Sequence, residues 1–167
     1  TINNTLTAAL ATIKENNDIQ FIWQTGKYYY PQVTEALRAA GELPNLYVTD
    51  FIKDMAAAYA ASDLVISRAG AGSISEFCLL HKPVVLVPSP NVAEDHQTKN
   101  ALALVDKQAA IYVKDSEAEA KLMDVALSTV ADDRKLKELS ENIAKLALPD
   151  SARIIAQEVI KLAEAEN

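Results

Sequence analysis

The residues that build disulfides and metal centres are scarce in this sequence. Its 167 residues include one cysteine, Cys78, and two histidines, His81 and His96. A lone cysteine cannot form an internal disulfide, and with two histidines it falls short of the usual four-ligand zinc site. Because Cys78 stands in the apolar run 77–80, we expect a small buried side chain rather than a reactive thiol. The sequence therefore predicts no metal, no cofactor and a reducing, cytoplasmic compartment.

Basic residues and long apolar runs are scarce as well. Lysine and arginine number 16 against 23 acidic residues, which gives a net charge of -7. This balance argues against a grip on the phosphate backbone of nucleic acid and against a polybasic membrane patch. The longest apolar stretches fall far short of the ~20 residues of a membrane span. We predict no nucleic-acid partner and no membrane contact through this chain.

The rest of the composition is that of one globular domain. Half of the residues are hydrophobic and 23% are charged. A chain of this length can bury roughly 70% of the surface that its unfolded form exposes. No internal repeat and no linker rich in proline, glycine or serine interrupts the sequence. We therefore predict a single domain over residues 1–167.

Two periodicities alternate along the chain and set the expected fold. Short apolar runs predict strands at residues 19–23, 46–48, 64–67, 84–87 and 111–113. Helical spacing predicts helices near residues 6–13, 31–40, 54–61, 77–80, 95–105, 116–130, 132–146 and 151–163. Strand, loop and helix in this order are typical of βαβ units. The predicted fold class is α/β, a Rossmann-like parallel sheet with helices on both faces.

Ligands of such sheets bind at the carboxyl ends of the strands, so the loops that follow strands are the places to search. We expect three of these loops to line one cleft. In the first, residues 49–55, Phe51 and Ile52 can present backbone groups to a flat ligand such as a base. The alternative is that both side chains simply plug the core.

The second loop, residues 67–76, carries the glycines Gly70 and Gly72 between a strand and a helix. Glycines at a helix start let the backbone approach a phosphate closely, where free N–H groups and the helix dipole favour negative charge. The loop lacks the third glycine of the dinucleotide fingerprint and the lysine of a P-loop. Arg68 in the same loop is either a phosphate clamp or an ion-pair partner at the surface.

The third loop, residues 88–100, is long and polar, and it follows the most apolar strand. His96 and Asn100 are four residues apart and share a helix face, with Gln97 beside them. Amides and an imidazole grouped at a helix start suit the hydroxyls of a sugar. The alternative is a solvated first helical turn.

Several polar residues near these loops also fit helix caps. Ser73 and Glu76 have the spacing of a capping box, in which each side chain would satisfy a backbone N–H. Asp95 can cap the helix that follows it. The pair 132–133 lies between two helices and is expected to be a cap rather than a metal pair. The sequence leaves open whether Glu76 caps a helix or binds a ligand.

The motifs at residues 51–55, 67–76 and 95–101, with a C-terminal segment at 148–153, together resemble the donor-site motifs of the MurG family. The likeness covers essentially the whole chain, with the motifs in the family's order and spacing. Members of that family transfer N-acetylglucosamine from UDP-GlcNAc to lipid I and form lipid II in peptidoglycan synthesis. They have the GT-B architecture of two Rossmann-like domains, and this chain looks like the second, C-terminal half.

Carried over by position, the resemblance implies a UDP-GlcNAc site. Backbone groups at Phe51 and Ile52 would meet uracil, and Glu76 would hold the ribose hydroxyls. The helix start 71–73 would meet the diphosphate, and Gln97 would read the sugar hydroxyls. The implied substrate-binding residues are Phe51, Ile52, Arg68, Ala71, Gly72, Ser73, Glu76, His96, Gln97 and Asn100.

Parts of the family's pattern are missing from the sequence. The Gly-Gly-Ser loop that precedes a helix like the one near Ile2 is absent, and so is the acceptor domain with its candidate base. With Thr1 in place of methionine, we expect an excised C-terminal domain that holds no catalytic residue and is inactive alone. Lipid I would be met by the missing N-terminal domain of a full-length enzyme on the cytoplasmic face of the bacterial inner membrane. Two alternatives are the soluble half of a two-subunit transferase and a non-catalytic UDP-sugar binding module.

Overall fold

Helices and short strands alternate along the computed structural model, which describes residues 1–165. The strands are β1 (Phe21–Gln24), β2 (Leu46–Thr49), β3 (Val65–Ser67), β4 (Val84–Leu86) and β5 (Ile111–Tyr112). The helices are α1 (Ile2–Ala8), α2 (Leu10–Glu15), α3 (Tyr30–Ala40), α4 (Met55–Ala61), α5 (Ala71–Leu79), α6 (His96–Val105), α7 (Ala118–Val130), α8 (Asp133–Ala144) and α9 (Ser151–Ala165). Two 3₁₀ turns, η1 (Ala93–Asp95) and η2 (Asp115–Glu117), precede α6 and α7.

The strands are parallel throughout, as predicted, but they form two sheets and not one. β1 pairs with β2, and β4 lies between β3 and β5. The expectation of a single sheet was therefore wrong for this chain. The commonest doubly wound sheet has the strand order 3-2-1-4-5-6. The observed pairings match that order with its first strand left out, so that β1 and β3 each keep one edge without a partner strand among the described residues.

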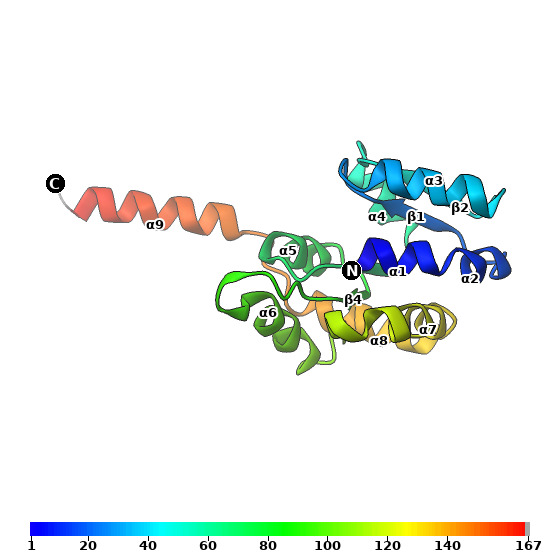
Figure 1. Cartoon of the computed structure of the whole chain (residues 1–167). Helices are drawn as coiled ribbons and strands as arrows, with labels where there is room; N and C mark the ends of the chain where they lie inside the picture. The colour runs from blue at the N-terminus through cyan, green and yellow to red at the C-terminus, as the bar shows by residue number, and fades with distance from the viewer. Residues whose placement is uncertain (166–167) are drawn as a thin grey trace.

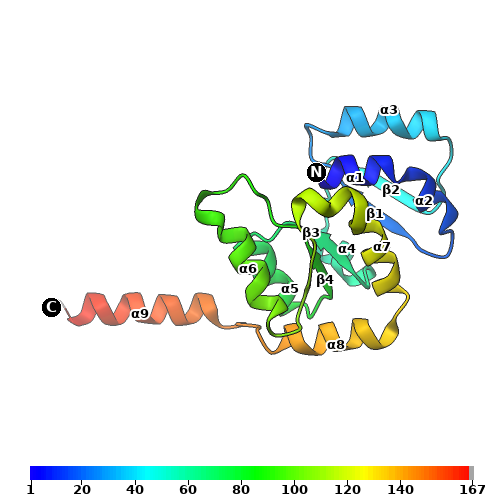
Figure 2. The ribbon, with the colours of Figure 1, turned by 60° about the horizontal axis from the view of Figure 1, so that its bottom comes forward.

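Helices α1 and α7 join the two sheets, and they pack against each other (Figure 2). On the side of the two-stranded sheet, Trp23 of β1 lies in one apolar cluster with Met123 of α7. On the side of the three-stranded sheet, Val85 of β4 lies in another cluster with Ile2 of α1. Helices α1 and α7 each contribute side chains to both clusters. The apolar interior therefore continues from one sheet to the other.

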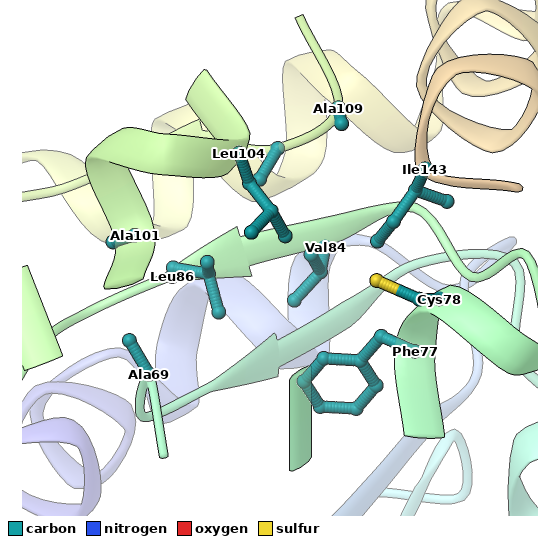
Figure 3. Close-up of a cluster of buried hydrophobic side chains, with 10 residues drawn as sticks. Ala69, Phe77, Cys78, Val84, Leu86, Ala101, Leu104, Ala109 and Ile143 are labelled. Carbon is teal, nitrogen blue, oxygen red and sulfur yellow. The ribbon is translucent and has the colours of Figure 1, made fainter. Parts of the chain in front are cut away.

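Strand β4 is the centre of the three-stranded sheet. Residues 84–87 are completely buried, which fits the β-branched run and confirms the prediction of a core strand. Val84 and Leu86 face a cluster built by α5, α6 and α8 (Figure 3). The predicted burial of Cys78 in this cluster is confirmed, and that burial raises the pKa of its thiol. A protonated, enclosed thiol is a packing group and not a nucleophile.

The ends of several helices follow the predicted capping chemistry. Gly41 ends α3 with a left-handed φ of 82°, a conformation that favours glycine. Asp132 caps α8 by accepting a hydrogen bond of 2.9 Å from the backbone N–H of Lys135, so the cap interpretation of this pair is confirmed. One predicted helix differs, since the segment near residues 6–13 breaks at Ala9 into α1 and α2.

Helix α9 extends away from the body of the molecule (Figure 1). Residues 151–164 are all exposed, and they include five large apolar side chains, Ile154, Ile155, Val159, Ile160 and Leu162. The helix confirms the element predicted at 151–163. Among the described residues, no helix has both the length and the apolar character that crossing a bilayer requires.

Candidate functional site

The loops after β3 and β4 are tied together at the carboxyl ends of these strands. One guanidinium nitrogen of Arg68 donates to the carbonyl oxygens of Val87 and Pro88, over 3.0 and 3.1 Å. The side-chain amide of Asn100 donates to the carbonyl oxygen of Ala69 over 3.1 Å. These bonds place the start of α6 beside the loop that leads into α5. The structure thus brings together two of the three loops that the sequence singled out.

Arg68 also forms an ion pair with the carboxylate of Asp115. Thr1 donates its hydroxyl to the other oxygen of this carboxylate over 2.7 Å. Burial opposes ionisation of Asp115, but the hydrogen bonds from Arg68 and Thr1 and the charge of Arg68 outweigh it and hold its pKa below the ordinary value. The ion-pair interpretation of Arg68 is therefore the one that the structure supports. Any contact between Arg68 and a ligand would have to use its remaining donors.

Helix α5 begins at Ala71, with Gly70 as its N-cap residue and no side chain capping it. The first intrahelical hydrogen bond runs from Ile74 to Gly70, so the N–H groups of residues 71–73 have no partner within the helix. The capping-box interpretation is wrong, because Ser73 lies inside the helix and Glu76 does not reach back to its start. Free N–H groups at the positive end of a helix dipole suit a phosphate.

The two glycines of this loop leave open space at the start of α5. A Cβ atom at Gly72 would meet nothing within 4 Å, and one at Gly70 would meet only the Ser73 hydroxyl at 4.0 Å. Neither glycine has a left-handed φ. Packing and backbone strain therefore do not require glycine at these positions, and the room they leave is available to a ligand.

Glu76 lies one turn further along α5, and its carboxylate is exposed to solvent. The phenol of Tyr59 on α4 donates a hydrogen bond of 3.0 Å to its Oε2 atom. Burial, the hydrogen bond and the charge of Glu76 together raise the pKa of Tyr59 to about 12. The phenol therefore remains a donor at any physiological pH, and the carboxylate next to it is oriented but accessible.

The start of α6 presents two side-chain amides that leave different hydrogen-bonding groups free for a ligand. Gln97 accepts a hydrogen bond of 2.9 Å at Oε1 from the backbone N–H of Ser89, so its NH₂ group is left to donate. Asn100 donates its NH₂ group to the loop before α5, so its oxygen is left to accept. The Nδ1 atom of His96 lies 2.6 Å from the carbonyl oxygen of Ala93 and therefore carries the proton. A donor and an acceptor side by side suit sugar hydroxyls, which do both.

The turn before α6 has an unusual backbone. Glu94 and Asp95 both have a left-handed φ of 53°, which non-glycine residues rarely adopt. Asp95 makes no capping hydrogen bond with its side chain, so the prediction that it caps α6 was wrong. A capping residue usually has an extended backbone, whereas Asp95 has a left-handed one. Strain of this kind is concentrated at functional sites in proteins.

The first loop lies beside a cavity of about 450 Å³. Phe51 is 60% exposed and does not plug the core, whereas Ile52 is half-buried. The backbone N–H of Ile52 donates to Oε1 of Gln24 at the end of β1 over 2.8 Å. The cavity is lined by Ile22, Tyr47, Thr49, Asp50, Phe51, Ile52, Lys53, Asp54 and Ala58. It does not extend to the other two loops, so the expectation of one cleft lined by all three was wrong for this cavity.

Three groups that support the candidate site were not singled out in the sequence. They are the side chains of Gln24 and Tyr59 and the backbone N–H of Ser89. Gln24 carried a usable signal, because it is a polar residue at the carboxyl end of a strand, where ligands bind. Tyr59 carried none, since its role depends on contacts of its side chain with Glu76 and Phe77 that form only in the fold.

Comparison with known proteins identifies the family. The model of the glycosyltransferase family 28 C-terminal domain matches residues 1–155. The chain belongs to this family. A family member from Bacteroides thetaiotaomicron, the UDP-N-acetylglucosamine–N-acetylmuramyl-(pentapeptide) pyrophosphoryl-undecaprenol N-acetylglucosamine transferase, is 99% identical over all 167 residues. The transferase of the same name from Bacteroides fragilis is 79% identical over 98% of the chain.

Solved structures show where the family 28 domain sits in a larger protein. The crystal structure of MurG from Acinetobacter baumannii matches with a TM-score of 0.78 and 26% identity, over 95% of this chain and 48% of that one. This likeness confirms the α/β class and the Rossmann-like half of a GT-B glycosyltransferase. The solution structure of ALG13 matches with a TM-score of 0.56 and 20% identity over 80% of its length, which shows the fold alone. The chain spans 45% of the length of the Bacteroides thetaiotaomicron relative.

Proposed function

We propose that residues 1–167 form the donor-binding domain of a transferase that moves N-acetylglucosamine from UDP-GlcNAc to lipid I, the undecaprenyl-diphosphate N-acetylmuramyl pentapeptide. The product is lipid II, a precursor of peptidoglycan. The observation that carries this proposal is the 99% identity, over the whole chain, with a transferase whose name states this donor sugar and acceptor. The chain covers 45% of that relative, so the proposal assigns the acceptor side to the remainder.

The geometry at the carboxyl ends of the strands suits the parts of UDP-GlcNAc in order. The loop at Phe51 and Ile52, beside its cavity, is assigned to uracil, and the accessible carboxylate of Glu76 to the ribose hydroxyls. The open helix start 71–73 is assigned to the diphosphate. The amides of Gln97 and Asn100 are assigned to the sugar, with His96 beside them. Arg68 contributes by holding the two loops together.

The helix start has a specific part in the proposed reaction. When the bond between the sugar and the diphosphate breaks, negative charge grows on the departing UDP. Free N–H groups and the positive end of the α5 dipole at residues 71–73 stabilise that charge where it develops. The domain thereby makes UDP a better leaving group. Attack by the acceptor hydroxyl requires a base and an acceptor held in line with the anomeric carbon, and we assign both to the other half of the enzyme.

This division of roles also sets the proposed location of the full-length enzyme. Its acceptor is a lipid, so the enzyme would work at the cytoplasmic face of the bacterial inner membrane as a peripheral protein. The donor domain carries a net charge of -7, which disfavours contact with an anionic bilayer surface. We therefore place the membrane contact on the acceptor half.

The proposal is tested by separating binding from transfer. Calorimetric titration of the chain with UDP, and with ADP as the matched control, is expected to show weak binding of UDP and weaker binding of ADP. An assay with UDP-GlcNAc and a lipid I analogue is expected to show no turnover by the chain alone. Equal affinity for the two nucleotides would contradict the uracil assignment, and turnover by the isolated chain would contradict the division of roles.

A further inference from the structure

Tyr59 on α4 and Glu76 on α5 are 17 residues apart in the sequence, and their side chains meet in the fold. The phenol oxygen of Tyr59 on α4 lies 3.0 Å from Oε2 of Glu76 on α5. The ring of Tyr59 packs edge-on against Phe77, with the ring centroids 5.9 Å apart, and Phe77 is 1% exposed. The core therefore fixes the ring, and the hydroxyl at its tip reaches the surface at a carboxylate.

We propose that Tyr59 is a positioning residue for the ribose of the nucleotide, because it holds Glu76 in the orientation that accepts the two ribose hydroxyls. This inference rests on the proposed function, in which Glu76 is the ribose ligand. An ionised carboxylate has about four lone-pair positions on its two oxygens. Tyr59 occupies one of them on Oε2, which leaves Oε1 and the rest of Oε2 for a pair of neighbouring hydroxyls.

The gain comes from preorganisation. An exposed glutamate side chain samples several rotamers, and a ligand that needs one of them must bear the cost of ordering it. Tyr59 orders the Glu76 side chain before any ligand binds, because its own ring is already held by Phe77. Ordering one such side chain changes affinity by roughly 2- to 12-fold.

The same contact has a purely structural explanation, in which the carboxylate only satisfies a half-buried phenol. The two explanations differ in what they predict for a nucleotide without ribose hydroxyls. If Tyr59 acts through Glu76 on the ribose, removing its hydroxyl weakens UDP and leaves 2′,3′-dideoxy-UDP unaffected. If the contact is only structural, removing it changes both affinities equally or changes neither.

The experiment measures the dissociation constants of the whole chain for UDP and for 2′,3′-dideoxy-UDP by calorimetry. The ratio of the two constants reports ribose recognition. We expect a ratio of about tenfold or more for the unmodified protein, a ratio roughly 2- to 12-fold smaller for Tyr59→Phe, and a ratio near one for Glu76→Gln. The double variant is expected to match Glu76→Gln alone, because the phenol has nothing left to position.

Tyr112→Phe is the matched control. Tyr112 is also half-buried against the same apolar cluster, and the structure gives its hydroxyl no hydrogen-bond partner within residues 1–165. This variant is expected to keep both affinities. Thermal melting of every variant shows whether the fold is retained.

The outcomes separate the inference from the function it rests on. A ratio near one in the unmodified protein overturns the ribose assignment of Glu76, and the role of Tyr59 with it. A large ratio that Glu76→Gln abolishes but Tyr59→Phe leaves unchanged overturns the role of Tyr59 alone. A Tyr59→Phe variant that loses affinity for both nucleotides equally, at an unchanged ratio, assigns the contact to packing and also overturns the inference.

Discussion

The backbone N–H of Ile52 donates a hydrogen bond of 2.8 Å to the side-chain oxygen of Gln24. This bond joins the carboxyl end of β1 to the loop after β2, which lines the cavity assigned to uracil. Because the Ile52 N–H is already used, a base in this cavity has to bond other backbone groups of the loop. Gln24 therefore shapes the site through its Oε1 atom, which already accepts this hydrogen bond.

Removing the acceptor at Gln24 is expected to loosen this loop. Gln24→Ala should weaken UDP binding by about 2- to 12-fold, the equivalent of one hydrogen bond worth ~0.5–1.5 kcal/mol. Gln24→Glu keeps an acceptor of the same reach and serves as the control. Calorimetry with UDP checks the prediction, and equal losses in both variants would show that the hydrogen bond is not what matters.

Gly72→Ala should separate stability from binding. Alanine is favoured over glycine in a helix by up to ~1 kcal/mol, and the new Cβ atom meets nothing, so the Tm should rise by a few degrees at most. The same Cβ fills the space in front of the helix start, so affinity for UDP should fall.

Gly41→Ala is the control for this comparison, because it makes the same substitution at the end of α3. Gly41 has a φ of 82° and a ψ of -162°, a combination that essentially glycine alone adopts, so alanine there is strained by roughly 1–3 kcal/mol. Stability should therefore fall and UDP affinity should stay the same. A Gly72→Ala variant with undiminished affinity for UDP would remove the diphosphate from this helix start.

Glu76→Gln should weaken UDP binding by about tenfold or more, because charge-assisted hydrogen bonds to two hydroxyls are worth ~1.5–3 kcal/mol each. Its Tm should hardly change, and the same holds for Glu76→Ala, since Glu76 caps no helix in the structure. Calorimetry and thermal melting of the two variants provide the check. Loss of stability in Glu76→Ala with full affinity would restore the capping interpretation.

The pair of Arg68 and Asp115 predicts how stability depends on pH. The folded pKa of Asp115 lies below its unfolded value, so the carboxylate contributes stability above the unfolded pKa of ~3.9 and loses it as the pH falls through the folded pKa. Asp115→Asn should therefore be less stable than the unmodified protein at neutral pH, and the difference should shrink in acid.

Urea unfolding between pH 2.5 and 7 measures this difference. Glu141→Gln is the control, because Glu141 and Lys137 form an exposed pair with 3.9 Å between their charged atoms. Exposed pairs of this kind contribute ~1 kcal/mol or less. A stability difference for Asp115→Asn that is independent of pH would contradict the assignment.

Local patterns in the sequence predicted the elements but not their assembly. The run at residues 84–87 identifies a core strand because it is continuous and β-branched, and the structure buries it completely. The division into two sheets could not be predicted, since it depends on which strands become neighbours in space. The capping box proposed at Ser73 was wrong because the N-cap residue of α5 is Gly70, and a glycine N-cap leaves no side-chain signal in the sequence.

The candidate site shows the same limit. Phe51, Gln97 and Asn100 were singled out because they lie in or just after loops that follow strands, where ligands of parallel sheets bind, whereas the ligand role of Glu76 came from the resemblance. Their supporting residues Gln24 and Tyr59 act across loops and helices, so their roles appear only in the folded chain. The left-handed turn at 94–95 could not be predicted either, since two consecutive non-glycine residues rarely both have a left-handed φ.

Helix α9 has a consequence for the kinetics of hydrogen exchange. Residues 151–164 are all exposed, so little besides the helix's own backbone hydrogen bonds stabilises it, and an isolated helix of this length is marginal in water. Its amides should exchange within the shortest labelling times, whereas those of residues 84–87 should exchange only when the whole domain unfolds. Deuterium uptake in this chain would thus reveal two regions of very different protection, with the boundary between α8 and α9.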